Sequence, residues 1–120
     1  MENEKKFVIQ EHSSDKGVHW DFMLESGQTL ETYRLDNNPK GMLKKETNGV
    51  KIFDHPLKFL TYHGPVNNGR GSVAIVESGT YRIISQDETK IELELAGQTL
   101  DGNCILTKIK NNNWRFGIIT

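Results

Sequence analysis

The stretch HWDFMLES, residues 19–26, alternates between apolar and mostly polar side chains. Successive side chains of a β-strand face opposite sides, so a strand here places Trp20, Phe22 and Leu24 on one face. The opposite face then carries His19, Asp21, Met23 and Glu25. The stretch therefore predicts an amphipathic strand whose polar face holds an imidazole two residues from a carboxylate.

The same two-residue period recurs along most of the chain, with turn residues between the runs. Hairpin turns are expected at Ser26-Gly27, Ser78-Gly79 and Asp101-Gly102, and in the asparagines of KNNNW, residues 110–114, because glycine and asparagine tolerate positive φ. The expected strands are residues 7–12, 18–25, 29–35, 50–53, 57–63, 72–77, 80–85, 90–96, 104–109 and 113–119. So many short strands leave open edges unless the sheet closes. We therefore expect an all-β fold, a small closed or partly closed antiparallel β-barrel with hairpin connections, with a β-sandwich as the second choice.

Length and composition favour one domain over residues 1–120, with residues 1–6 frayed. The 15 Lys and Arg against 16 Asp and Glu give a net charge of -1, without the basic excess of a protein that coats long nucleic acid. The single Cys104 excludes an internal disulfide, and we find neither a signal peptide nor a membrane-spanning apolar run. We expect a soluble, cytoplasmic protein without a membrane partner.

Two stretches are predicted to be long loops. Residues 36–49 combine proline, glycines and charges, with one helical turn expected at MLKKE, residues 42–46. Residues 63–72, HGPVNNGRGS, hold three glycines, a proline and an arginine. Long loops in a compact domain are often functional or mobile.

The histidines suggest a metal site. Gln10 and His12 share one face of the first strand, and if the first two strands pair antiparallel, His12 meets His19 and Asp21 on one surface. Two histidines and one carboxylate suit Mn²⁺, Zn²⁺ or Fe²⁺ with positions left open for water or substrate. The alternative is a solvated strand face that binds nothing.

Two further residues could contact an anion. His55 precedes Pro56, which holds it in extended backbone, so its imidazole could donate to an anion or act as an acid, or only cap a turn. Arg70 stands between glycines, where the backbone could approach a ligand closely, and it could equally be a flexible surface side chain.

Taken in order, several motifs resemble the 3′-phosphoesterase domain of bacterial and archaeal DNA ligase D. They are FVIQEH (7–12), HWDFMLE (19–25), FDHPLKF (53–59), HGPV (63–66), GRGSV (69–73), ESGTY (77–81), LAGQTLDGNCILTK (95–108) and NWRFGI (113–118). The resemblance implies a small β-barrel enzyme, usually with manganese, that removes a terminal ribonucleoside and then the 3′-phosphate from a DNA or RNA 3′ end. It implies a role in DNA repair and a possible separate ligase or polymerase partner.

The resemblance also assigns roles to residues. His12, His19 and Asp21 resemble the metal ligands and, with His55 at the scissile phosphate, the catalytic residues, while Gln10 resembles a first-strand neighbour of the site. The chain departs from the family pattern at Met23, where the family carries an arginine that holds the phosphate. The stretch RLDNNP, residues 34–39, lacks the family lysine, the segment between His12 and His19 is one residue longer, and His63 stands where the family has a glutamate.

These departures leave two functions open. We expect Arg34, Arg70 and His63 to complete the substrate-binding side, in which case the chain is a metal-dependent phosphoesterase. The alternative is a catalytically weak or inactive module of the same fold that binds a metal, an anion or a nucleic-acid end.

Overall fold

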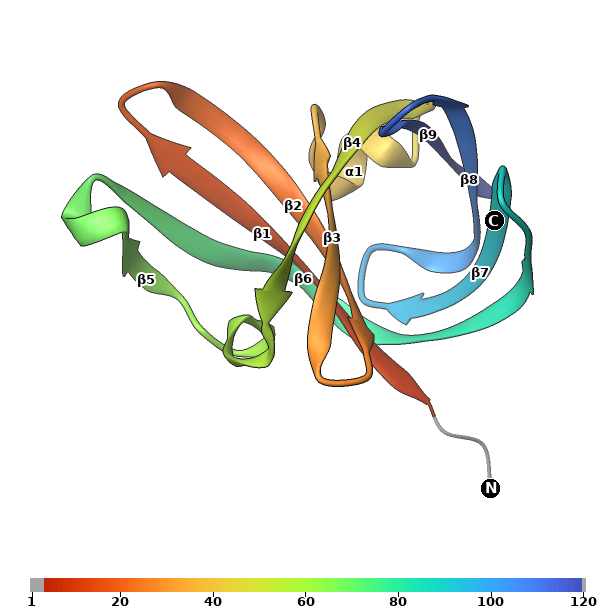
Figure 1. Ribbon diagram of the computed structural model, residues 1–120, viewed down its shortest axis with the longest axis horizontal. Coiled ribbons are helices and arrows are strands. Elements are labelled where there is room, and N and C mark those ends of the chain that lie inside the picture. Colours follow the sequence, from red (N-terminus) through yellow and green to blue (C-terminus); the bar gives the residue numbers. More distant parts are fainter. Residues whose placement is uncertain (1–3, 120) are drawn as a thin grey trace.

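A computed structural model describes residues 4–119 of the chain. Figure 1 shows strands throughout, with a single short helix (α1) labelled. The strands are β1 (Lys5–Ser14), β2 (Gly17–Ser26), β3 (Thr29–Leu35), β4 (Thr47–Pro56), β5 (Gly64–Val66), β6 (Gly71–Gln86), β7 (Lys90–Gly97), β8 (Asp101–Lys110) and β9 (Asn113–Ile119). The helical segments are α1 (Pro39–Met42) and the 3₁₀ turns η1 (Leu57–Leu60) and η2 (Asn67–Gly69). The all-β prediction is confirmed.

The strands form one antiparallel sheet that closes on itself (Figure 1). Neighbours follow the order β1-β2-β3-β4-β9-β8-β7-β6-β5, and an additional pairing joins β1 to β6. That pairing connects the two ends of the series in a ring-like arrangement, with β5 added to β6 outside it. Closure leaves few unpaired edges, as the strand count predicts.

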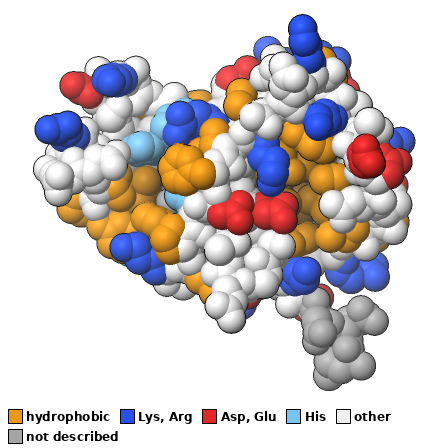
Figure 2. All heavy atoms as spheres, viewed as in Figure 1, with side chains coloured by type: hydrophobic (Ala, Val, Ile, Leu, Met, Phe, Trp, Pro, Cys, Tyr) orange, Lys and Arg blue, Asp and Glu red, His pale blue; other side chains and the backbone are white. Residues whose placement is uncertain are grey.

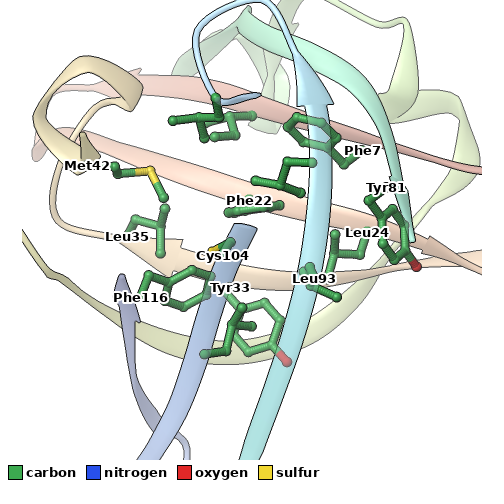
Figure 3. Packing of buried hydrophobic residues seen from close by; sticks show 14 of the residues in the cluster. Phe7, Phe22, Leu24, Tyr33, Leu35, Met42, Tyr81, Leu93, Cys104 and Phe116 are labelled. Carbon is green, nitrogen blue, oxygen red and sulfur yellow. The ribbon is translucent and has the colours of Figure 1, made fainter. Parts of the chain in front are cut away.

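The alternation of the sequence separates two hydrophobic clusters. Phe7 and Ile9 of β1, with Phe22 and Leu24 of β2, point into the large core that the ring encloses (Figure 3). The residues between them point to the opposite, outer face, where Val8, Met23 and Leu30 form a second cluster. Two hairpin turns lie where they are expected: Gly27 (φ 63) joins β2 to β3, and Asn111 (φ 54) joins β8 to β9.

Residues 57–63 are not the strand that we expected. After Pro56, in extended backbone, the chain enters the turn η1 and places Leu57, Phe59 and Leu60 against the second cluster. The apolar residues that mimic a strand therefore act as a cover over the outer face of β1–β3. Tertiary burial decides the conformation of this short apolar run.

The expected turn at Ser78-Gly79 does not exist, because β6 runs without interruption from Gly71 to Gln86. Gly79 lies opposite Gly97 of β7, and a Cβ at Gly79 would stand 2.1 Å from the carbonyl oxygen of Ala96. This glycine therefore permits close contact between two strands and does not form a turn.

Other local predictions are shifted. Asp101-Gly102 lies inside β8, and the reversal between β7 and β8 occurs at residues 98–100, where the carboxylate of Glu77 accepts the backbone N–H groups. The helical turn falls at Pro39–Met42, where Asn38 caps the N-terminus by accepting from the Gly41 N–H. The loop at 63–72 contains the unexpected short strand β5.

The chain ends also bear on the predictions. β1 begins at Lys5, within the segment 1–6 that we expected to be frayed, and residues 1–3 lie outside the described part of the chain. No helix formed by residues 4–119 has the length and apolar character needed to cross a bilayer.

Candidate metal and phosphate site

The pairing of β1 with β2 brings three predicted ligands together. In this register Gln10 lies opposite Asp21 and His12 opposite His19, all on the outer face. His12 Nδ1 is 3.0 Å from His19 Nε2, and His19 Nε2 is 3.5 Å from Asp21 Oδ2. One ligand atom from each of the three residues lies within 4.8 Å of the others. Strand parity and a short hairpin are sufficient to create this cluster.

The donor spacing fits a small divalent cation. Donors about 2.1 Å from an ion, at angles between octahedral and tetrahedral, lie roughly 3.0–3.4 Å from one another. Two of the three donor separations, 3.0 and 3.5 Å, lie close to this range, and all three donor atoms lie within 4.8 Å of one another. In addition, the second ring nitrogen of His12, Nε2, is buried without a hydrogen-bond partner, and the second carboxylate oxygen of Asp21, Oδ1, has no hydrogen bond and only the Arg34 guanidinium at 3.7 Å. The residues present therefore fit a metal ion.

The surroundings of His19 favour the neutral form of its imidazole. Burial lowers the pKa of the His19 imidazole; the Asp21 carboxylate opposes this shift, while Arg34 and His12 add to it. The lone pair needed for a metal bond belongs to the neutral ring. Asp21 itself is only 4% exposed, and the Arg34 guanidinium lies 3.7 Å away, from Nε to Asp21 Oδ1.

Both candidate arginines face the same groove as the histidines. Arg34 lies opposite Asp21 on β3, which settles the face of this strand, and Arg70 follows η2. A groove of about 970 Å³ is lined by His12, Lys16, His19, Arg34, Asn68 and Arg70, among others. Figure 2 shows the histidines gathered with cationic and hydrophobic side chains on one face. The structure thus brings Arg34 and Arg70 together with two of the ligands, from separate strands and a loop.

The outer face next to the cluster is covered by η1 and the residues that follow it, so it is not a solvated strand face. Gln10 is 1% exposed and donates through Nε2 to the carbonyl oxygens of Phe59, at 3.0 Å, and Tyr62, at 2.7 Å. Its amide nitrogen therefore anchors the covering segment. Met23 is fully buried under the same segment, so an apolar thioether fills the position where the resemblance leads us to expect an arginine.

His55 lies apart from the cluster, on β4. Its Nδ1 is 2.9 Å from Thr32 Oγ1 and 3.2 Å from the carbonyl oxygen of Phe53. A carbonyl only accepts, and the Thr32 hydroxyl donates to the carbonyl of Leu30, so Nδ1 must be the donor to both. His55 Nε2 is consequently the ring nitrogen left for a substrate.

His63 and several unexpected residues complete the description. His63 is exposed, directly precedes β5 and is not among the residues that line the groove. We did not anticipate Thr32, which orients His55, or Asn67 and Asn68, which line the groove in left-handed backbone. Thr32 lies two residues before Arg34 in β3 and therefore shares its face of the strand. This spacing in the sequence could have identified Thr32 as a neighbour of the site.

Comparison with known proteins is consistent with the geometry. A profile of the DNA ligase D 3′-phosphoesterase domain matches residues 10–108. The multifunctional non-homologous end joining protein LigD of Mycolicibacterium smegmatis is 29% identical over 126 residues, which cover 93% of this chain and 16% of that protein.

Two further relatives extend the comparison. The multifunctional non-homologous end joining DNA repair protein LigD of Mycobacterium tuberculosis (strain H37Rv) is 29% identical over 115 residues, covering 90% of this chain and 15% of that protein. The LigD of Pseudomonas aeruginosa is 24% identical over 100 residues, covering 81% and 12%. The chain therefore spans between 12% and 16% of the length of these relatives.

Proposed function

The chain belongs to the DNA ligase D 3′-phosphoesterase domain family, and from this membership we propose that it is a divalent-metal-dependent phosphoesterase that trims nucleic-acid 3′ ends. The proposed reactions are removal of a 3′-terminal ribonucleoside and removal of a 3′-phosphate, in end healing during DNA repair. The observation that carries the proposal is the convergence of one donor atom each from His12, His19 and Asp21 within 4.8 Å.

His12, His19 and Asp21 would hold the ion, with Mn²⁺ as the first choice and Zn²⁺ or another divalent ion as alternatives. A bound ion supplies Lewis-acid polarisation of a phosphate oxygen and a water of lowered pKa. Asp21 contributes the single negative charge among the three ligands, and its burial excludes water that would compete for it. The His12 and His19 rings already meet edge-on, with centroids 4.6 Å apart and with His12 Nδ1 3.0 Å from His19 Nε2.

The remaining polar groups can position a phosphate. His55 Nε2 can donate to a phosphate oxygen when the ring is protonated, and Nδ1 keeps its two acceptors in either state. Arg34 and Arg70 supply positive charge along the groove, which is where charge on the phosphate oxygens would need compensation. A site for one chain end also needs no extended basic surface, in agreement with a net charge of -1.

The fully buried Met23 favours a second candidate function. Where the family has an arginine, this chain has an apolar side chain packed under η1, so one phosphate contact is missing from the covered face. A barrel-like module that binds a metal, an anion or a nucleic-acid end without turnover would tolerate that loss.

The two functions differ in turnover. A phosphoesterase releases phosphate from a 3′-phosphorylated primer with added Mn²⁺, and His19→Ala and Asp21→Ala abolish the release. Asp101→Asn, at an exposed carboxylate on β8, is the matched control and retains it.

Thermal melting separates metal binding from turnover. Mn²⁺ at a hundredfold excess over its dissociation constant adds about 2.7 kcal/mol to the stability of the folded chain. A melting shift without phosphate release supports the binding module, and the absence of both results refutes the metal site altogether. The proposed substrate is a DNA or RNA–DNA end in the cytoplasm, and a separate ligase or polymerase is the proposed partner.

A further inference from the structure

Phe53 exposes an aromatic ring on β4, the strand that pairs with β3 at Arg34. Phe53 is 74% exposed, more than any other large hydrophobic residue among residues 4–119. The ring is not isolated, because it lies parallel to the imidazole of His55, with centroids 5.0 Å apart and an interplanar angle of 7°. One ring face of Phe53 is therefore occupied, and its exposure indicates that the other face is open to solvent.

The stacked pair is held in place from below. His55 is hydrogen-bonded through Nδ1 to Thr32 and to the carbonyl of Phe53, and the ring of Phe59 meets it edge-on with centroids 5.8 Å apart. His55 is therefore held by two hydrogen bonds at Nδ1 and by the edge-on contact with Phe59, and the Phe53 ring stacks on this positioned imidazole. A flat ring that is already ordered loses little entropy when another ring stacks on it.

The strand register places this pair next to the phosphate-binding candidates. Arg34 lies opposite Val50 on β4, three residues from Phe53, and Asp21 lies opposite Arg34 on the other side of β3. Two strand spacings and three residues along a strand correspond to roughly 14 Å between the Cα atoms of Asp21 and Phe53. His19, Arg34 and His55 lie on β2, β3 and β4, the three strands that this distance crosses.

We propose that the Phe53–His55 pair is a subsite for the terminal nucleobase, which stacks on the outward face of Phe53 while its 3′-phosphate lies toward Arg34 and the His12–His19–Asp21 cluster. This inference rests on the proposed function and adds the recognition of the base to it. Stacking is tolerant of sequence because every base has a flat π-face. The ligand is consequently a single-stranded or frayed 3′ end, whose last base is free to leave its neighbours.

The test compares two single-stranded oligonucleotides with a 3′-phosphate that differ only in the last nucleotide, which carries a base in one and is a tetrahydrofuran abasic analogue, which cannot β-eliminate, in the other. Dissociation constants are measured by fluorescence anisotropy without added metal. We expect the wild type to bind the base-bearing end about tenfold more tightly, the usual size of one aromatic–base stack. In Phe53→Ala and Phe53→Leu the ratio of the two constants falls to about one.

The substitutions at Phe53 could also displace His55 and weaken its contact with the phosphate. Both oligonucleotides carry the same phosphate, so this effect cancels in the ratio of their dissociation constants. Phe53→Trp is expected to keep the preference, and its indole fluorescence to be quenched by the base-bearing end only. Val50→Ala, which removes the neighbouring exposed apolar side chain on β4, is the matched control and keeps the wild-type ratio.

Equal binding of both ends by the wild type, or an unchanged ratio in Phe53→Ala, overturns the stacking subsite. A preference that survives in Phe53→Leu also overturns it, because a general apolar contact would then suffice. The proposed function is tested separately by phosphate release from the abasic oligonucleotide with added Mn²⁺, with Asp21→Ala as the control. This oligonucleotide has no terminal base, so the result does not depend on stacking on Phe53.

Discussion

Glu77 provides the sharpest test of how this ring of strands is held together. The residue is 3% exposed on β6, and its carboxylate accepts four backbone N–H groups. The donors are Ser78 at 3.0 Å, Gln98 at 3.1 Å, Thr99 at 2.8 Å and Leu100 at 2.6 Å. Three of them belong to the reversal between β7 and β8, so one side chain satisfies a turn that lacks the usual turn residues.

The cost of removing this carboxylate follows from the number of donors left behind. In Glu77→Ala the N–H of Leu100, in a buried bond, and those of Thr99 and Gln98, in partly buried bonds, lose their acceptor. An unsatisfied buried donor costs about 1–3 kcal/mol, and water entering the space left by the side chain recovers part of it. We expect a loss of about 3–5 kcal/mol, a large share of the stability of a small domain.

The assay is urea denaturation of the wild type, Glu77→Ala, Glu77→Gln and the control Glu88→Ala, an exposed glutamate before β7. Glu77→Gln retains one carbonyl acceptor but turns an amide donor toward N–H groups, so its loss should be about 2 kcal/mol or more. Hydrogen exchange should accelerate at Thr99 and Leu100 in both variants. A loss below 1 kcal/mol for Glu77→Ala would refute the reasoning, since the turn would then be stable without its acceptor.

Three further outcomes are expected. Gln10→Ala removes both hydrogen bonds to the covering segment, so limited proteolysis should cut near Phe59–Tyr62 faster than in the wild type, with a stability loss of about 1–3 kcal/mol; unchanged cleavage would contradict the anchoring role. Met23→Arg places a guanidinium in a fully buried apolar cluster and should cost about 3 kcal/mol by urea denaturation; an unchanged midpoint would mean that the cover moves aside easily. Burial raises the pKa of the Cys104 thiol from 9.0 to about 12, so the folded state favours the protonated thiol; this stability is complete below pH 9 and is lost between pH 9 and 12. In Cys104→Ala that part of the alkaline decline should disappear from a pH series of melting temperatures, and an unaltered decline would assign it to other groups, such as Tyr81, whose pKa burial raises to about 12.

The convergence of His12, His19 and Asp21 could be predicted from the sequence because every step toward it is local. Period-two alternation sets the face of His19 and Asp21, and a short turn between β1 and β2 makes those strands pair. The same reasoning identifies most of the strands, with β3 and β9 matching to the residue. The proposed phosphoesterase function was inferred from the family resemblance and not from the alternation of side chains. A polar strand face by itself is equally compatible with a surface that binds nothing.

The groove and the cover depended on contacts between distant segments. Arg70 lines the same groove as His12 and His19 because β6 pairs with β1, and Arg34 lines it because of the register of β3 on β2. η1 is not a strand because its apolar residues pack against Val8 and Met23 on the outer face of the sheet. Two residues of β6 also depend on distant contacts. Gly79 is needed because β7 approaches it closely, and the Glu77 carboxylate accepts N–H groups from the turn between β7 and β8.

The amino-acid order by itself determined which side chains share a face of each strand, because that alternation is a property of the extended backbone. Only the tertiary structure decided which faces are covered, which charges meet and where Phe53 is left open, because these depend on the register and closure of strands far apart in the chain. The predicted ligands accordingly lie together, whereas the arginines, the buried Gln10 and the stacked pair on β4 became recognisable only in three dimensions.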